Sequence, residues 1–230
     1  MSRKILGGAI LALTITASTA VTALPHIAAP AAAESGCADE KLPVYGYDHF
    51  KNIFPNSPVS ALVALNDQFD RVQRAVFCLT NVERANAGVP ALKWSDDLST
   101  SAAVFARHAE GRQWWTDGAN FHDDPDLAGV PVNTQVQRRV QSNNPCTYYK
   151  GDGHDVNRWS ENLYAGWDST DFTTPQAAVT WWMNSPTHRA NILDRNVTKL
   201  GVGVRAGAAR PGIDPAKTAG TFVQQFAGCS

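Results

Sequence analysis

The spacing of the apolar residues changes along this chain, and this change limits the fold more than any other feature. A helical pattern begins near Val59 and is predicted to end before Gly88 and Pro90. Its apolar face carries Phe69, Val72, Val76 and Leu79. Near the other end of the chain, residues 200–205 and 221–227 alternate in the two-residue period of strands. Helices followed by late strands predict a layered α+β domain.

Three further helices are predicted between Pro90 and Met183. Ser95 is placed to cap the first of these helices. The apolar stripe of this helix carries Leu98, Ala102, Phe105 and Ala109. Residues 132–140 form a short helical pattern inside a long polar segment. Thr174 followed by Pro175 is a typical helix start, and this helix is predicted to run through Met183.

The N-terminal residues predict export from the cell. Arg3 and Lys4 precede a largely apolar run, and no charged residue occurs from Ile5 to Ala33. This layout is typical of a secretory signal peptide, so we expect cleavage after Ala33 rather than a membrane-spanning helix. Removing Arg3 and Lys4 leaves a mildly acidic domain, which gives no electrostatic reason to expect nucleic-acid binding.

Four cysteines lie after this segment: Cys37, Cys78, Cys146 and Cys229. An even number in an exported chain predicts two disulfides, and four cysteines allow three pairings. We expect one bond between the outer two and one between the inner two, with lipid attachment to Cys37 as the alternative fate of that thiol. Cys146 would pin residues 116–158, a long segment rich in Gly, Asp, Asn and Pro.

The local sequence around His188, WWMNSPTHRANIL, allows two interpretations of this residue's role. Ser185 suits a helix N-cap and Pro186 the first helical position, which places His188 in the first turn. The positive end of a helix disfavours a charged imidazole, and a neutral ring suits a metal ligand or general base. The alternative is that the ring simply bonds to a neighbouring backbone group.

Two other residues are candidates for chemistry in the same site. His122 stands among acids in NFHDDPD, and Glu161 stands among apolar residues in RWSENLYAG. A carboxylate in apolar surroundings usually has a designated partner, because unpaired burial is costly. A solvated loop histidine and a glutamate that accepts backbone bonds are the alternatives. The sequence contains no G-x-S-x-G and no H-E-x-x-H pattern.

Five stretches in order carry a resemblance to a known family. They begin with LTNVERANAGVPALKWSDDLSTSAAVFARHAE and NFHDDPD, and continue with SENLYAG, AAVTWWMNSPTHRANILDRNVTKLGVGV and FVQQFAG. Together they resemble the bacterial branch of the CAP superfamily, which includes cysteine-rich secretory proteins, antigen 5 and pathogenesis-related 1 proteins. The resemblance covers about residues 75–228. It implies a three-layer α-β-α sandwich, to which we add a small N-terminal helical extension.

The resemblance also implies that His122, Glu161 and His188 meet in one cleft. There they would be the catalytic residues or the ligands of Zn²⁺ or another divalent metal. The eukaryotic branch of the family has a second glutamate three residues after a helical tryptophan. Here Trp182 is followed three residues later by Ser185, so that acid is missing. Its absence weakens any two-carboxylate mechanism.

The expected organisation is a signal peptide (1–33), an N-terminal arm that includes the start of the first helix (34–74), and a CAP domain (75–230). We expect a secreted, monomeric binding module without a transmembrane span, whose ligand is a lipid or sterol, a cell-envelope component or a protein. Trp114, Trp115 and Trp167 are candidates for its binding surface. A metal-dependent hydrolase or protease that uses the same cleft is the alternative, and a structural protein of the envelope is a third reading.

Overall fold

A computed structural model describes residues 36–146, 155–214 and 218–229, all of which belong to one compact unit, Glu34–Ser230. The predicted signal peptide, residues 1–33, lies outside the described residues. In the described ranges, no helix combines the length and the apolar character needed to cross a membrane.

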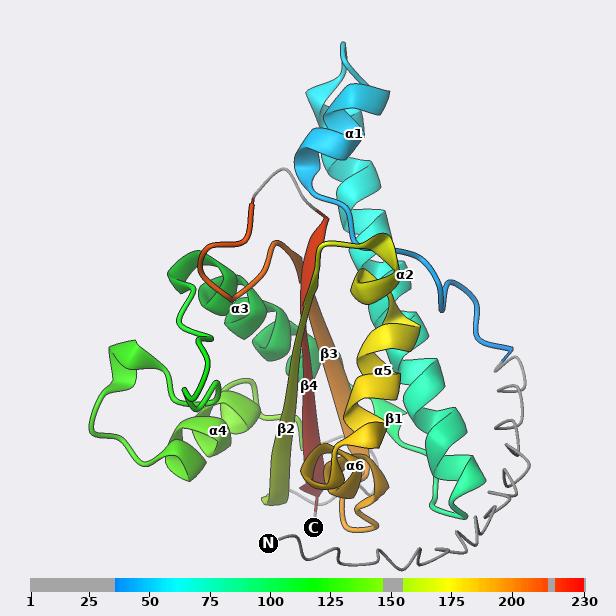
Figure 1. Cartoon of the computed structure of the whole chain (residues 1–230). Coiled ribbons are helices and arrows are strands. Elements are labelled where there is room, and N and C mark those ends of the chain that lie inside the picture. Colours follow the sequence, from blue (N-terminus) through cyan, green and yellow to red (C-terminus); the bar gives the residue numbers. More distant parts are fainter. Residues whose placement is uncertain (1–35, 147–154, 215–217, 230) are drawn as a thin grey trace, which may run out of the picture. The chain divides into compact units, whose positions relative to one another are not determined.

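A four-stranded sheet forms the middle layer of this unit (Figure 1). Its strands are β1 (Lys93–Trp94), β2 (Val156–Trp167), β3 (Lys199–Ala206) and β4 (Ala219–Cys229). Their order across the sheet is β1-β3-β4-β2. β4 pairs antiparallel with both β2 and β3, whereas β1 runs parallel to β3. β2 is therefore an outer strand of the sheet.

Helices cover both faces of the sheet (Figure 1). On one face, α3 (Asp96–Arg112) packs on β3 and β4, and α4 (Val132–Gln141) packs on β2. The other face carries α2 (Pro58–Asn86), α5 (Pro175–Asn184) and α6 (Pro186–Leu193). The remaining helices are short: α1 (Tyr47–Ile53), η1 (Pro125–Leu127) and η2 (Thr170–Thr173). The predicted three-layer α-β-α sandwich is confirmed.

The predicted helix starts and apolar faces agree with the structure. Ser95 Oγ accepts a hydrogen bond from the Leu98 N–H at 3.3 Å, and Thr174 Oγ1 accepts one from the Ala177 N–H at 3.1 Å. Every residue of the two predicted apolar stripes is buried. The first stripe packs in the core between α2 and the sheet, and most of the second packs between α3 and the other face of the sheet.

Two glycines of β3 allow α3 to lie unusually close to the sheet. A Cβ atom placed on Gly201 would lie 2.2 Å from the backbone nitrogen of Ser99. A Cβ atom on Gly203 would lie 2.2 Å from backbone atoms of Ala102 and Ala103. The alternation of valine and glycine in LGVGV therefore gives β3 one face of side chains that packs toward α2 and one bare face that meets α3.

β2 is the longer of the two strands that the sequence pattern did not predict, the other being the two-residue β1. Its polar residues Ser160, Glu161 and Asn162 are consecutive, so the two-residue alternation of a half-buried strand is interrupted. Pairing with β4 over its whole length holds this segment extended. The polar side chains of Glu161 and Asn162 are buried in hydrogen-bond networks, which a local pattern does not reveal.

The N-terminal arm contains a short helix and is bonded to the rest of the unit. Residues 37–57 include α1, which lies where a small N-terminal helical extension was expected. The Val44 N–H donates to the Thr173 carbonyl at 3.0 Å. Tyr45 exchanges two backbone hydrogen bonds with the side chain of Gln68, both 3.0 Å long.

The disulfides are Cys37–Cys78 and Cys146–Cys229, so the expected outer-with-outer pairing is wrong. Cys37 lies beside α2, which carries Cys78, and their Cα atoms are 5.8 Å apart. Cys229 lies opposite Val156 at the start of β2, and its Cα atom is 5.5 Å from that of Cys146. The pairing depends on these strand and helix positions, and spacing along the chain does not encode them.

Candidate functional site

The three predicted site residues come from three different elements. His122 lies in the connection between α3 and α4, Glu161 lies in β2, and His188 lies in the first turn of α6. Nδ1 of His122 and Oε1 of Glu161 are 3.0 Å apart. The predicted meeting of His122 and Glu161 is thus present in the structure, and His188 is near enough for the charge of His122 to affect its pKa.

Buried amides hold these elements in place. The fully buried side chain of Gln135 on α4 accepts from the Asp124 N–H at 2.9 Å and donates to the Val130 carbonyl at 2.8 Å. These bonds fix the loop that carries His122. Asn162 Nδ2 on β2 donates to the His188 carbonyl at 3.1 Å, which attaches α6 to the sheet.

Both carboxylate oxygens of Glu161 are fully engaged. Arg139 donates from Nη2 to Oε1 at 2.8 Å and from Nε to Oε2 at 3.1 Å, and Gln225 Nε2 donates to Oε2 at 3.0 Å. The side chain of Glu161 has no exposed surface. Burial by itself would raise the pKa of Glu161, but the bond from His122 and the charge of Arg139 outweigh it and lower the pKa to about 2.

Arg139 is the site residue that sequence reasoning missed. It lies near the end of α4, its guanidinium stacks 4.0 Å from the ring centre of Phe105, and Nη2 also donates to the His122 carbonyl. It therefore neutralises Glu161 and holds the His122 loop. The helix of residues 132–140 was predicted, but its local pattern does not indicate which carboxylate Arg139 reaches.

His188 is held by the N-cap residue of its own helix and by a tryptophan of α5. Its Nδ1 lies 2.7 Å from Ser185 Oγ, and its ring lies 4.9 Å from the ring of Trp181. Ser185 is at the N-cap position as expected, but its hydroxyl makes no capping bond and contacts the histidine instead. Burial and, to a smaller extent, the charge of His122 lower the pKa of His188 to about 4, so the ring is neutral at pH 7.

The two imidazoles are engaged through the same ring atom, Nδ1. The ionised Glu161 only accepts hydrogen bonds, so Nδ1 of His122 carries the proton between them. Ser185 engages Nδ1 of His188. Within the part of the chain that the structure describes, the Nε2 atoms of His122 and His188 have no hydrogen-bond partner.

This arrangement bears on the divalent metal predicted at His122, Glu161 and His188. Glu161 does not fit the role of a direct ligand, because four donors occupy its oxygens and a guanidinium lies against it. It fits the role of a carboxylate that orients a histidine through Nδ1. The donors that remain for a cation are the Nε2 atoms of the two histidines.

A second group of metal-type ligands lies outside the predicted set. Among the described residues, ligand atoms of His108, Asp124 and Asp126 lie within 4.8 Å of one another. His108 Nε2 is 3.1 Å from Asp124, and Arg112 pairs with Asp126. The guanidinium of Arg112 offsets the negative charge that would attract a cation to this group.

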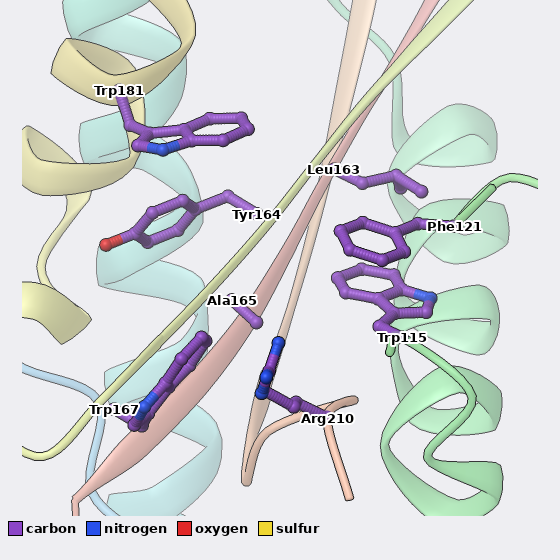
Figure 2. A pocket seen from close by; sticks show the side chains of 8 residues that line it. All are labelled: Trp115, Phe121, Leu163, Tyr164, Ala165, Trp167, Trp181 and Arg210. Atoms are coloured by element: carbon purple, nitrogen blue, oxygen red, sulfur yellow. The ribbon is translucent and has the colours of Figure 1, made fainter. Parts of the chain in front are cut away.

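An aromatic pocket lies along β2 (Figure 2). Its volume is about 140 Å³, and it is lined by Trp115, Phe121, Leu163, Tyr164, Ala165, Trp167, Trp181 and Arg210. Trp181 contacts the His188 ring, so the pocket adjoins that imidazole, and Phe121 is the residue that precedes His122 in the chain. Of the three predicted tryptophans, Trp115 and Trp167 line this pocket and Trp114 does not.

Known proteins resemble this chain in sequence and in structure. Residues 77–226 match the sequence profile of CAP, the cysteine-rich secretory protein family. The uncharacterised protein YkwD of Bacillus subtilis is 30% identical over 131 residues, which is 57% of this chain and 41% of that protein. The chain therefore spans less than half the length of this curated relative.

Solved structures of low sequence identity also align with the chain. An extracellular protein with an SCP domain from Bacillus anthracis has 22% identity and a TM-score of 0.46, covering 70% of this chain and 43% of that one. An outer surface protein from Borrelia burgdorferi has 17% identity and a TM-score of 0.44, covering 67% and 90%. The profile match over residues 77–226, together with the sandwich described above, shows that this chain belongs to the CAP family of cysteine-rich secretory proteins.

Proposed function

We propose that this chain is an exported binding protein whose ligand occupies the cleft formed by the aromatic pocket and the His122–His188 pair. The observation that carries the proposal is the contact between them: the Trp181 ring lines the pocket and lies 4.9 Å from the ring of His188. Such a cleft offers apolar surface for one part of a ligand and two ring nitrogens for a polar part.

The state of Glu161 favours binding over metal-dependent hydrolysis. A general base for water activation needs a free lone pair and a pKa near the working pH. The carboxylate of Glu161 is buried, bonded to four donors and has a pKa of about 2. The second acid of the eukaryotic family branch is replaced by Ser185, whose hydroxyl contacts His188.

Export from the cell is part of the proposal. Residues 1–33 have the layout of a signal peptide, and disulfides such as Cys37–Cys78 and Cys146–Cys229 persist in oxidising compartments. Two of the similar structures are described as an extracellular protein and an outer surface protein. The proposed organisation remains a signal peptide (1–33), an N-terminal arm (34–74) and the CAP domain (75–230).

The proposal is tested with residues 34–230 produced in an oxidising compartment. Tryptophan fluorescence reports on the pocket, because Trp115, Trp167 and Trp181 line it. The probes are a long-chain fatty acid, a sterol, isolated bacterial cell wall and a short apolar peptide. We expect at least one probe to bind, and Trp181→Ala to weaken that binding by about tenfold or more.

Val104→Ala is the matched control, since Val104 is an exposed apolar residue on α3 that does not line the pocket. Absence of binding by all four probes, or equal losses in the two variants, would overturn the proposal. Zinc-dependent cleavage of a peptide that is lost in His188→Ala would replace it with the hydrolase alternative.

A further inference from the structure

We propose that the free edge of β2 binds an extended peptide segment as an additional β-strand, with the aromatic pocket receiving two adjacent apolar side chains of that peptide. The inference rests on the proposed binding function of the cleft and names its ligand class. It is carried by the hydrogen-bonding direction of the β2 backbone, by the composition of the strand, and by the position of the pocket on both sides of it.

The sheet register shows which backbone groups of β2 point away from the sheet. The N–H groups of Thr198 and Gly207 donate to the carbonyls of Ala227 and Ala219. Odd-numbered residues of β4 therefore bond toward β3, and even-numbered ones bond toward β2. Because Tyr164 lies opposite Phe222, it bonds to β4, and its neighbours Leu163 and Ala165 direct their backbone groups outward.

Some of these outward groups are already paired. Trp182 Nε1 on α5 donates to the Leu163 carbonyl at 3.0 Å, and Asn191 Nδ2 on α6 reaches the Glu161 carbonyl at 3.4 Å. Both contacts agree with the direction derived from the register. Beyond them, the outward N–H and carbonyl of Ala165 and the outward N–H of Trp167 have no partner among the described residues. These are the groups that a peptide backbone complements.

Apart from the contacts of Trp182 and Asn191, the described end of this edge at residues 162–167 lacks the usual protection against strand addition. Natural sheets protect their edges with charged residues, proline, bulges or a covering element. Residues 162–167 read NLYAGW, which includes no charge and no proline. The irregularity in the β2–β4 register lies between Val156 and Arg158, at the other end of the strand. The uncharged end of β2 is thus suited to accept a further strand.

The pocket lies on both sides of this edge (Figure 2). Tyr164 and Trp181 are on one side of β2, whereas Leu163, Phe121 and Trp115 are on the other. Successive side chains of a strand point to opposite faces. Two neighbouring apolar residues of an added strand would therefore enter the two sides of the pocket. A lipid chain would use the apolar surface but would leave the outward groups of Ala165 unpaired.

The test uses an acetylated and amidated hexapeptide, Ser-Thr-Phe-Leu-Thr-Ser, with the disulfide-bonded protein of residues 34–230. Two further peptides carry a single N-methyl group, one on the phenylalanine amide and one on the leucine amide. In an added strand, alternate N–H groups point toward β2. We expect one N-methyl peptide to bind about tenfold more weakly than the parent, because it loses about one hydrogen bond to β2. The other should bind within about threefold of the parent, because its methylated amide points away from β2.

Equal weakening by the two N-methyl groups, or none by either, would overturn the inference. The comparison uses unmodified protein, so it does not depend on whether a variant folds. Ala165→Pro removes an outward N–H without removing a bond of the sheet, and we expect it to weaken the parent peptide about tenfold. A fatty acid or sterol that binds through Trp181 while the parent peptide does not bind would refute strand addition and leave the proposed binding function standing.

Discussion

Arg139 and Glu161 form a buried ion pair at the centre of the candidate site, with Nη2 to Oε1 at 2.8 Å and Nε to Oε2 at 3.1 Å. The side chain of Glu161 is fully buried, and that of Arg139 is 11% exposed. The same carboxylate orients His122 through Nδ1. The pair therefore links α4, β2 and the His122 loop, and it removes Glu161 from the groups available to a ligand.

Replacing this carboxylate should destabilise the protein strongly. Glu161→Gln leaves the guanidinium of Arg139 buried without its counter-charge, so we expect a loss of about 3–5 kcal/mol in the free energy of unfolding. Asp39→Asn is the control, because Asp39 pairs with Arg71 at the surface and should cost less than about 1 kcal/mol. Urea denaturation of the two variants provides the comparison, and similar losses would contradict the role assigned to the buried pair.

Stability should fall in two steps as the pH is lowered. The pKa of His188 is lowered to about 4, so the unfolded chain takes up a proton from pH 6.5 downward while the folded chain does so only near pH 4. The pKa of Glu161 is lowered to about 2, so its contribution, on the order of 3 kcal/mol, is lost as the pH falls from 4.5 to 2.

The histidine step can be isolated by mutation. Chemical denaturation from pH 7 to pH 4 should show a smaller loss of stability in His188→Gln than in the unmodified protein. His49→Gln is the matched control, since His49 is exposed on α1. If the free energy of unfolding of His188→Gln fell between pH 6.5 and 4 as steeply as that of the unmodified protein, the His188 ring would not resist protonation in the folded state.

The contact between β3 and α3 predicts opposite effects for two glycine substitutions. A Cβ atom on Gly203 meets the α3 backbone at 2.2 Å, so Gly203→Ala should destabilise the protein by at least about 3 kcal/mol. A Cβ atom on Gly111, within α3, meets no atom within 4 Å, and Gly111→Ala should stabilise it by roughly 0.5–1 kcal/mol. Thermal unfolding of both variants tests the sign of each effect.

Peptide mapping under non-reducing conditions should recover two linked pairs, Cys37 with Cys78 and Cys146 with Cys229. Replacing both cysteines of either pair with serine should cost about 2–5 kcal/mol. Recovery of a Cys37–Cys229 peptide from folded protein would contradict the arrangement of the arm and of β4.

The two-histidine arrangement predicts weak zinc binding. Calorimetric titration should give a binding free energy smaller in magnitude than the roughly 10–16 kcal/mol of four-ligand structural zinc sites. Because Nε2 of each ring is the donor, His122→Ala and His188→Ala should each abolish this binding. His108→Ala is the control for the separate His108–Asp124–Asp126 group. Zinc binding that is lost only in His108→Ala would assign the cation to that group.

Local sequence was sufficient for features that local physics governs. Ser95 and Thr174 were predicted as helix caps because their hydroxyls bond two or three residues ahead, and both do so. The apolar stripes on α2 and α3 follow from helix periodicity, and both are buried. The strands at residues 200–205 and 221–227 follow from alternation, and both lie within β3 and β4. The layering itself was expected from the resemblance to the CAP family.

Other features were decided by tertiary structure, because they join residues that are far apart in the chain. β2 is a strand because β4 pairs along its whole length, although its own polar residues interrupt the alternation. Glu161 was chosen from the sequence as a residue that needs a partner, but the folded chain determines that the main partner is Arg139, 22 residues away. The disulfides and the two-sided pocket on the edge of β2 likewise depend on which elements the sheet brings together. A sequence specifies its helices through contacts of three or four residues, whereas the chemistry of this cleft depends on contacts that form only when the three layers pack.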